Sequence, residues 1–229
     1  MEQIAETLGQ TILLAGHYGS GKTNIAMNLA VLLRRAGRRV TVIDLDIINP
    51  YFRLADGSGL LEEYGIGHVA PMYANTNVDI PALPPRIAGL LDTFDGTLII
   101  DVGGDDTGAA ALGGYAEAIE RRGYEMLLAV NKFRPFTETG RDAAAVAAEI
   151  ETVSRLRFTG IAANPNLGRE TARETILDAL PFTDALAEQM GLPVVLTAVR
   201  EDLVPLVGGE IRGPVLPLHI LTKPGWEIY

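Results

Sequence analysis

Gly16-His17-Tyr18-Gly19-Ser20-Gly21-Lys22-Thr23 is the stretch of sequence that decides the fold. It fits the pattern G-x-x-x-x-G-K-[ST], which is typical of a loop that binds phosphate groups. An apolar run from Thr11 to Ala15 precedes it and is short enough for a buried strand. Apolar residues at helical spacing follow it from Ile25 to Leu33. The pattern therefore lies between a strand and the start of a helix, which is the context that such a loop requires.

Each part of this loop has a chemical purpose. Glycines let the backbone turn tightly, so that successive N–H groups can point at phosphate oxygens. The following helix presents its positive N-terminal end to the same anion. Lys22 is expected to reach the β- and γ-phosphates, and Thr23 to place its hydroxyl on Mg²⁺. The alternative, a glycine-rich turn that carries Lys-Thr by chance, is disfavoured by the flanking strand and helix. The expected nucleotide-binding residues of the loop are Gly16, His17, Tyr18, Gly19, Ser20, Gly21, Lys22, Thr23 and Asn24.

Strand-like and helix-like segments alternate along the 229 residues, of which 48% are hydrophobic. This alternation predicts an α/β fold of three layers, with a mostly parallel, doubly wound sheet of the P-loop NTPase type. We expect a single nucleotide-binding domain over residues 1–229, with its core at about 11–205 and a Pro- and Gly-rich tail at 206–229.

Four finer expectations concern the elements. Residues 1–10 read as a short polar lead, and residues 109–122 as one helix of small residues. A later helix is expected to be broken at Pro181. The tail is expected to hold one last short strand at 215–221.

Composition excludes several classes of protein. The formal net charge of -10 argues against holding nucleic acid by bulk positive charge. The chain has no cysteine, which excludes disulfides, thiolate metal sites and cysteine-ligated iron–sulfur clusters. No secretory signal precedes the first strand and no apolar run approaches membrane-spanning length, so we expect a cytoplasmic location.

A carboxylate ends the apolar strand at 97–102. Asp101 is followed by Gly103 and Gly104, which fits a Walker B aspartate combined with D-x-x-G. The carboxylate would hold Mg²⁺, directly or through water, and the N–H of Gly104 could bond the γ-phosphate and sense its loss. A strand-ending Asp in a glycine turn is the alternative interpretation.

Two more carboxylates, Asp44 and Asp46, end the strand that follows the first helix. They could orient an attacking water and support the metal, or they could form a solvated acidic turn. The predicted catalytic residues are Lys22, Asp46 and Asp44, and the predicted metal ligands are Thr23, Asp44 and Asp101.

The order of these motifs resembles the deviant-Walker-A ATPases, which include MinD, ParA, the nitrogenase iron protein and the CobQ and CobB nucleotide-binding domains. The resemblance extends from about Thr11 to about Pro205. It implies ATP and Mg²⁺ as ligands, an unidentified protein partner and a possible homodimer. It further implies that Asp46 positions the hydrolytic water, that the loop up to Arg53 is switch I, and that residues 101–104 are switch II.

One departure from that family concerns its loop, which usually begins Lys-Gly-Gly, with the lysine reaching the nucleotide of the partner subunit. This chain has His17-Tyr18-Gly19 at those positions. Histidine is shorter and weakly charged near neutral pH, so a face-to-face dimer lacks its usual cation. Arg53 and Lys132 are the candidates to replace it. The nitrogenase-type role fails because it needs cysteines, and the end of the chain, 223–229, is not a basic amphipathic membrane helix.

The residues that end two of the later strands predict which base the bound nucleotide carries. Asn131-Lys132-Phe133-Arg134 superficially resembles the guanine-reading pattern N-K-x-D, but Arg134 takes the place of the Asp that would accept from guanine. Asn164 stands one strand later, where the resembled ATPases carry an Asn that bonds adenine, and the segment 198–205 would pack on the base. The alternative for Asn164 is a turn residue, which Asn-Pro favours.

Three functions are compatible with these motifs. The first is a slow, nucleotide-switched ATPase that acts on a protein partner. The second is an ATP-dependent small-molecule synthetase or amidating enzyme on the same scaffold, of the dethiobiotin synthetase or cobyrinate synthase type. The third, an ATP-binding module without hydrolysis, is disfavoured by the three aspartates together.

Overall fold

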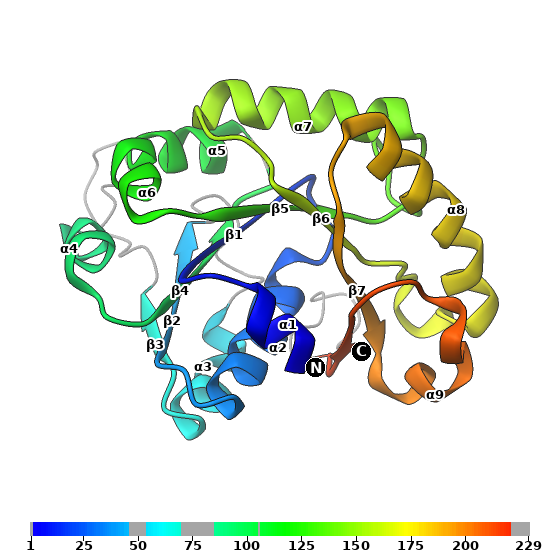
Figure 1. The fold of residues 1–229 in the computed structure, drawn as a ribbon, viewed down its shortest axis with the longest axis horizontal. Helices are drawn as coiled ribbons and strands as arrows, with labels where there is room; N and C mark the ends of the chain where they lie inside the picture. The colour runs from blue at the N-terminus through cyan, green and yellow to red at the C-terminus, as the bar shows by residue number, and fades with distance from the viewer. Residues whose placement is uncertain (1, 46–53, 70–84, 105, 221–229) are drawn as a thin grey trace.

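The computed structural model describes residues 2–45, 54–69, 85–104 and 106–220. Its centre is an eight-stranded sheet in the order β3-β2-β4-β1-β5-β6-β7-β8, and every pair of neighbours runs parallel (Figure 1). The strands are β1 Thr11–Ala15, β2 Val40–Leu45, β3 Gly67–Val69, β4 Thr97–Val102, β5 Glu125–Val130, β6 Gly160–Ala163, β7 Val194–Arg200 and β8 Val215–Leu218. The prediction of a doubly wound α/β fold is confirmed.

Helices cover both faces of this sheet, as Figure 1 shows. The helices are α1 Glu2–Thr7, α2 Lys22–Arg35, α3 Leu54–Glu63, α4 Pro85–Thr93, α5 Asp106–Gly113, α6 Ala116–Arg122, α7 Gly140–Ser154, α8 Arg173–Met190 and α9 Val204–Val207. Core residues of α1, α2 and α3 pack on the face that carries Ile12 and Leu14. Core residues of α4 to α8 pack on the face that carries Leu13 and Ala15. Because both faces are covered, the central strands β1 and β4 are buried along their whole length and are mostly apolar.

The strand order reverses at β1, which lies between β4 on one side and β5 on the other. The chain connections on the two sides of β1 therefore run in opposite directions, away from the carboxyl end of β1. Ligands of open α/β sheets bind at such a reversal. The glycine-rich loop follows β1, so the topology places it at this point.

The expected polar lead is wrong, because residues 2–7 form α1. Ile4 and Leu8 are buried one helical turn apart, against the α2 face of the core. Arg38, in the connection between α2 and β2, bonds the end of this helix. Its guanidinium donates to the carbonyl oxygens of Ala5 (2.7 Å) and Leu8 (2.6 Å), which are groups that a helix end leaves without partners.

The single helix expected at 109–122 is also wrong, since α5 and α6 are separate. The chain turns at Gly114 and Tyr115. A Cβ on Gly113 would lie 2.8 Å from the carbonyl oxygen of Val153 at the end of α7, so the break lets two helices approach closely. By contrast, α8 continues through Pro181, because Ile176, Ala179 and Leu186 are buried on either side and hold the helix in place.

The sheet extends beyond residue 205, where the sequence placed the end of the core. The last strand, β8, pairs with β7 and carries the buried residues Leu216 and Leu218. Asn28 of α2 joins it through two hydrogen bonds to the backbone of His219, each 2.9 Å long. The C-terminal strand is therefore attached directly to the helix that follows the glycine-rich loop.

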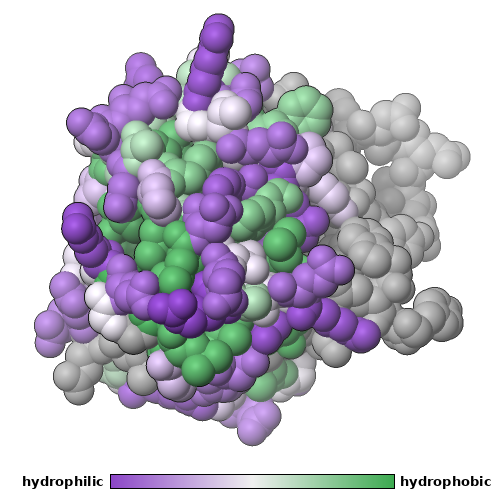
Figure 2. Space-filling view, turned by 90° about the vertical axis from the view of Figure 1, so that its right-hand side faces the viewer, coloured by the Kyte–Doolittle hydropathy of each residue, from purple (hydrophilic) through white to green (hydrophobic). Residues whose placement is uncertain are grey.

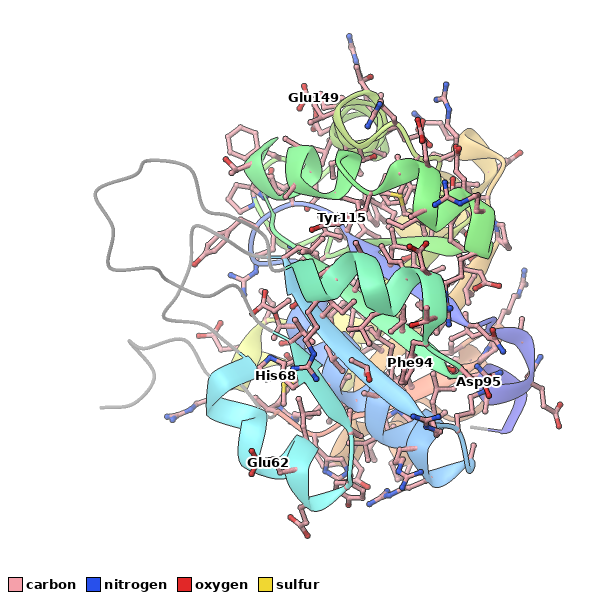
Figure 3. All side chains as sticks on the ribbon, turned by 90° about the vertical axis from the view of Figure 1, so that its left-hand side faces the viewer. Glu62, His68, Phe94, Asp95, Tyr115 and Glu149 are labelled. Carbon is pink, nitrogen blue, oxygen red and sulfur yellow. The ribbon has the colours of Figure 1, made fainter. Side chains whose placement is uncertain are left out.

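The arginines at the end of α2 are used within the protein. Arg34 and Arg35 bond the backbone and the hydroxyl of Tyr64, and the Arg39 guanidinium lies 5.2 Å from the centre of the Phe94 ring, which Figure 3 labels near the bottom of α4. These contacts hold the end of α2 against the neighbouring elements.

The face of the molecule around α8 and α9 carries apolar patches between charged side chains (Figure 2). A cavity of about 260 Å³ lies there between α8, β7 and residues 210–212. None of the residues that line it belongs to the glycine-rich loop. No helix in the described part of the chain combines the length and apolarity needed to cross a bilayer.

Candidate nucleotide site

The loop between β1 and α2 depends on glycine at two positions where a side chain could not fit. A Cβ on Gly16 would lie 2.3 Å from the carbonyl oxygen of Ala129 in β5. A Cβ on Gly21 would lie 2.1 Å from the side-chain nitrogen of Asn164, and the φ of Gly21 is 90°. Both glycines let the loop sit directly on the ends of β5 and β6, so the sheet itself sets the loop's shape.

Lys22, the first residue of α2, is folded back over the loop. Its side chain is buried, and its Nζ donates to the carbonyl oxygens of Gly16 (3.0 Å) and His17 (3.2 Å). These bonds hold the buried ammonium group over the loop, away from solvent. A lysine held in this way is ready to transfer its donors to a phosphate.

Thr23, Asp101 and Asp44 come together beside the lysine. The hydroxyl of Thr23 donates to Oδ2 of Asp101 at 2.7 Å, across the junction between α2 and β4. Asp44 is the register partner of Asp101 on the neighbouring strand β2, and both carboxylates are about 3% exposed. The three residues predicted to hold a metal therefore lie at one place, at the carboxyl ends of adjacent strands.

This group has two acidic residues, and the described residues hold no cluster of three or more His, Cys, Asp or Glu that could bind a metal by themselves. That composition suits Mg²⁺, which binds through one or two carboxylates and takes its other ligands from water and phosphate.

Gly104 lies against the loop, as the D-x-x-G pattern predicts. A Cβ at this residue would be 2.7 Å from the backbone nitrogen of Tyr18 and 3.0 Å from Nζ of Lys22. Gly104, two residues after the end of β4, therefore touches both the loop and Lys22. A change in the contacts of Lys22 would therefore also change those of Gly104.

Asn164, at the end of β6, is buried under the loop. Its Nδ2 donates to the carbonyl oxygen of Ser20 at 2.7 Å, and its buried Oδ1 has no hydrogen-bond partner among the residues that the structure describes. The amide orientation follows from chemistry, because a carbonyl oxygen can only accept. The sequence indicated a base-reading role for Asn164, and the structure adds a second one, which is to support the loop from below.

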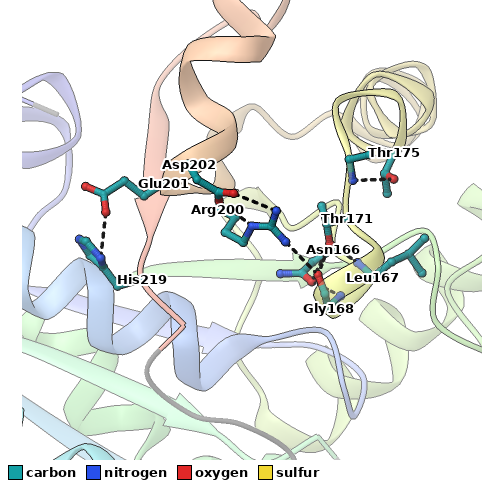
Figure 4. A network of polar contacts seen from close by, with 10 residues as sticks. Asn166, Leu167, Gly168, Thr171, Thr175, Arg200, Glu201, Asp202 and His219 are labelled. Carbon is teal, nitrogen blue, oxygen red and sulfur yellow. Dashed lines mark hydrogen bonds and ion pairs between the residues drawn. The ribbon is translucent and has the colours of Figure 1, made fainter. Parts of the chain in front are cut away.

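The loops after β6 and β7 are joined by hydrogen bonds and form one wall (Figure 4). Oδ1 of Asn166 accepts from the backbone nitrogen of Gly168 at 2.6 Å, and Nη1 of Arg200 donates to the carbonyl oxygen of Gly168 at 3.3 Å. Arg200 also binds both carboxylate oxygens of Asp202, and this bidentate contact lowers the pKa of Asp202. The segment 198–205, predicted to pack on the base, contributes to this wall.

Two predicted residues, Asp46 and Arg53, lie outside the described residues, as does the switch I loop between them. Lys132 is engaged elsewhere, since its Nζ lies 2.7 Å from Oδ2 of Asp178 in α8. Sequence reasoning missed Arg134, whose Nε donates to the carbonyl oxygen of Gly19 at 3.1 Å. Arg134 stands four residues after the end of β5, the strand next to β1, which places it at this end of the sheet without indicating its contact with the loop.

Comparison with known proteins gives the family. Residues 12–191 match the CbiA family, described as the CobQ/CobB/MinD/ParA nucleotide binding domain. The chain belongs to this family. The matched range contains the glycine-rich loop, Asp44, Asp101 and Asn164, so a nucleotide-binding P-loop domain is shown.

A curated relative agrees with this family assignment, and two solved structures share the fold. The chromosome-partitioning ATPase Soj of Thermus thermophilus is 32% identical over 115 residues, which are 48% of this chain and 40% of Soj. The structure resembles FtsY of Thermotoga maritima (TM-score 0.54, 17% identity, 86% of this chain and 68% of that one). It also resembles FtsY of Elizabethkingia anophelis in complex with GDP (TM-score 0.51, 22% identity, 82% and 56%). The structural likeness shows the fold alone, and the chain spans less than half the length of Soj.

Proposed function

We propose that this protein binds ATP with Mg²⁺, hydrolyses it slowly, and uses the state of its switches to bind and release a protein partner. The observation that carries the proposal is the 2.7 Å bond between Thr23 and Asp101, with Lys22 held beside them. A loop lysine, a helix-start hydroxyl and a strand-end carboxylate are the parts that P-loop NTPases use to hold a triphosphate and its metal.

The residues present fit both ligands. The backbone N–H groups of the loop and Nζ of Lys22 would hold the phosphates. Thr23, Asp101 and Asp44 would hold Mg²⁺, with its remaining ligands from water and phosphate. When bound, the ion neutralises negative charge on the phosphate oxygens. Asp46 is proposed to orient the attacking water by accepting a hydrogen bond from it.

The proposed base is adenine, and the support is the orientation of Asn164. Because its Nδ2 is bound to Ser20, Oδ1 is the atom left for a ligand. An acceptor can pair with the amino group at N6 of adenine, whereas guanine presents an oxygen at the corresponding position. A competition titration in which GTP binds more tightly than ATP would count against this assignment.

The test of the proposed function is phosphate release by the purified protein with ATP and Mg²⁺. Wild type should release phosphate slowly. Lys22→Ala should lose ATP binding by at least about a hundredfold, because a charge-assisted contact with phosphate disappears. Asp46→Ala should bind ATP within a few-fold of wild type but turn it over more slowly, since water positioning acts on the reaction step. Full affinity in the Lys22→Ala protein, measured by calorimetry, would remove the basis of the proposal.

A synthetase role is kept as the alternative, because His17 replaces the lysine on which family members that act as switches rely. Phosphate release that requires a small carboxylic acid and yields a new product would favour this alternative. Release that rises on addition of a protein partner, without a new product, would favour the switch.

A further inference from the structure

Asn131-Lys132-Phe133-Arg134 reads in the sequence as a guanine-reading motif that has lost its aspartate. In the structure these residues form the turn that follows β5, the strand next to β1. Asn131 is buried, and its Oδ1 accepts from the backbone nitrogen of Phe133 at 3.1 Å while its Nδ2 donates to the carbonyl oxygen of Asn166 at 2.7 Å. The asparagine is therefore a structural part of the turn.

The turn holds the backbone of Arg134 in one place. The nitrogen of Arg134 donates to the carbonyl oxygen of Asn131 at 3.1 Å. The carbonyl oxygen of Arg134 accepts from both the backbone nitrogen (3.1 Å) and the hydroxyl (3.1 Å) of the buried Thr137. Between them, Phe136 adopts a φ of 64°, which non-glycine residues rarely do unless their surroundings impose it. Arg134 thus sits on a rigid support.

The side chain of Arg134 extends to the phosphate-binding loop. Its Nε donates to the carbonyl oxygen of Gly19 at 3.1 Å, and Nε, Cδ and Cζ all lie within 4.0 Å of the place where a Cβ on Gly19 would be. Within the described part of the chain, the Nη groups, which carry four N–H donors, have no acceptor. The arginine is anchored by one nitrogen and presents the rest of its guanidinium at the rim of the loop.

The part of the loop next to Arg134 is the part that faces switch II. Gly104 lies against Tyr18, the residue before Gly19, and against Nζ of Lys22. The lysine of this motif serves the β- and γ-phosphates. Asn164, which is on the base side, instead touches Ser20 and Gly21. Arg134 is therefore beside the half of the loop where the terminal phosphate would lie.

The other cations near this rim are used elsewhere. Nδ1 of His17 is 3.0 Å from the carbonyl oxygen of Tyr18, so in the neutral ring Nδ1 carries the proton and Nε2 is left without one. The His17 ring packs 5.2 Å from that of Phe136. Lys132 is paired with Asp178. Arg134 and Lys22 remain as the cations directed at the loop among the described residues.

We propose that Arg134 binds the terminal phosphate of the nucleotide held by its own chain, and so supplies from the β5 turn the second cation that the loop lacks at His17. This inference rests on the proposed function. Guanidinium suits the task because its planar, permanently charged fork can donate two parallel bonds to phosphate oxygens while Nε keeps its anchor.

The test is calorimetric titration of the non-hydrolysable analogue AMP-PNP and of ADP, with Mg²⁺, into wild type, Arg134→Gln and Lys132→Gln. Arg134→Gln should weaken AMP-PNP at least about tenfold, ~1.4 kcal/mol, and ADP by less than about threefold. Lys132→Gln is the matched control, since it removes a cation from the same turn that points at α8. It should leave both affinities within about twofold of wild type.

An equal loss for both nucleotides would overturn the proposal, because Arg134 would then only support the Gly19 carbonyl. Unchanged affinities would overturn it as well. Should Arg134→Gln fail to fold by circular dichroism, Arg134→Lys decides: it keeps the charge but loses the fork, and must still weaken AMP-PNP more than ADP. If wild type binds neither nucleotide, the proposed function itself fails, and that result differs from every outcome in which wild type binds.

Discussion

Among single residues, Gly21 shows how closely the loop and the sheet are fitted. It combines a φ of 90° with a neighbour, Nδ2 of Asn164, only 2.1 Å from where a Cβ would be. A methyl group there would suffer backbone strain and would also push the asparagine from the Ser20 carbonyl. The shape of the phosphate cradle is therefore set by a contact between β6 and a position that only glycine can occupy.

We expect Gly21→Ala to reduce ATP affinity by at least about tenfold, because the displaced Asn164 no longer supports the loop. Gly37→Ala is the control. Gly37 has a similar φ of 87°, but a Cβ there would meet nothing within 4 Å. That variant should lose about 1 kcal/mol of stability and keep its ATP affinity. Calorimetry with both variants checks the comparison, and equal affinity losses would show that strain, not the contact, is responsible.

Residues of the site differ in how far the sequence could predict them. Thr23 and Asp101 could be predicted because a strand, a loop and a helix start specify one local backbone, which the motif encodes. Arg134 could not, since its contact with Gly19 joins positions 115 residues apart. Nothing near Arg134 in the sequence distinguishes a phosphate-facing arginine from a defective base-reading motif. Asp46 stays a prediction, because it lies outside the residues that the structure describes.

At the scale of elements, the central strands could be predicted because each is a short apolar run buried on both faces. Helix α1 could not, and the last strand β8 was predicted but its attachment to α2 was not. Helix α1 is anchored by Ile4 and Ala5, and by Leu8 just after its end, while Arg38, which is distant in sequence, bonds its last carbonyl oxygens. Strand β8 alternates buried and half-buried residues, and its attachment to Asn28 is a contact across 191 positions.

Asn28 gives a test of that attachment. Asn28→Ala would leave both backbone groups of His219 without their partners, and we expect a loss of about 1–3 kcal/mol in the free energy of unfolding. Thr152→Ala, which removes an exposed hydroxyl that bonds only within α7, should change stability by less than about 0.5 kcal/mol. Urea denaturation of both variants measures the difference. Equal stability of Asn28→Ala and wild type would mean that solvent replaces the contact without loss.

The edge strand β3 carries a histidine whose ring is partly buried. For His68, labelled in Figure 3 on this strand, the described part of the chain offers no hydrogen-bond partner to the buried Nε2, and burial lowers the pKa of the ring. The unfolded chain, with a pKa of about 6.5, then takes up a proton before the folded protein does. Stability contributed by the neutral ring is present above this value and is lost as pH falls through it towards the lowered folded pKa.

We therefore expect wild type to lose stability between about pH 7 and pH 5 relative to His68→Gln, which does not titrate in this range. Thermal unfolding followed at several pH values measures the effect. His219→Gln is a useful comparison, because His219 is exposed and paired with Glu201. A difference between wild type and His68→Gln that does not change with pH would contradict the expectation.

At the scale of the whole molecule, the proposed functional residues lie at the carboxyl ends of the strands. The loops after β1, β4, β5 and β6 meet there, and the rim they form carries two exposed aromatic side chains, Tyr18 at 45% and Phe136 at 68% exposed. Such residues favour contact with another protein surface. The net charge of -10 disfavours association between two copies unless a bound ligand or a local cation offsets it.

The final prediction concerns that association. A dimer across the nucleotide faces would need a cation from each subunit, and His17 is turned towards Phe136 while Lys132 is paired with Asp178. Arg134, by our inference, is committed to the nucleotide of its own chain. We therefore expect Asp46→Ala protein with ATP and Mg²⁺ to show at most weak self-association in sedimentation velocity, and none with ADP. Arg53 is the remaining candidate for this cation. Adding Arg53→Ala to the Asp46→Ala protein should abolish any ATP-dependent dimer that Arg53 supports. A tight dimer formed only with ATP, and insensitive to both Arg53→Ala and Arg134→Gln, would show that the two nucleotide faces are joined by apolar contact at the aromatic rim instead of by charge.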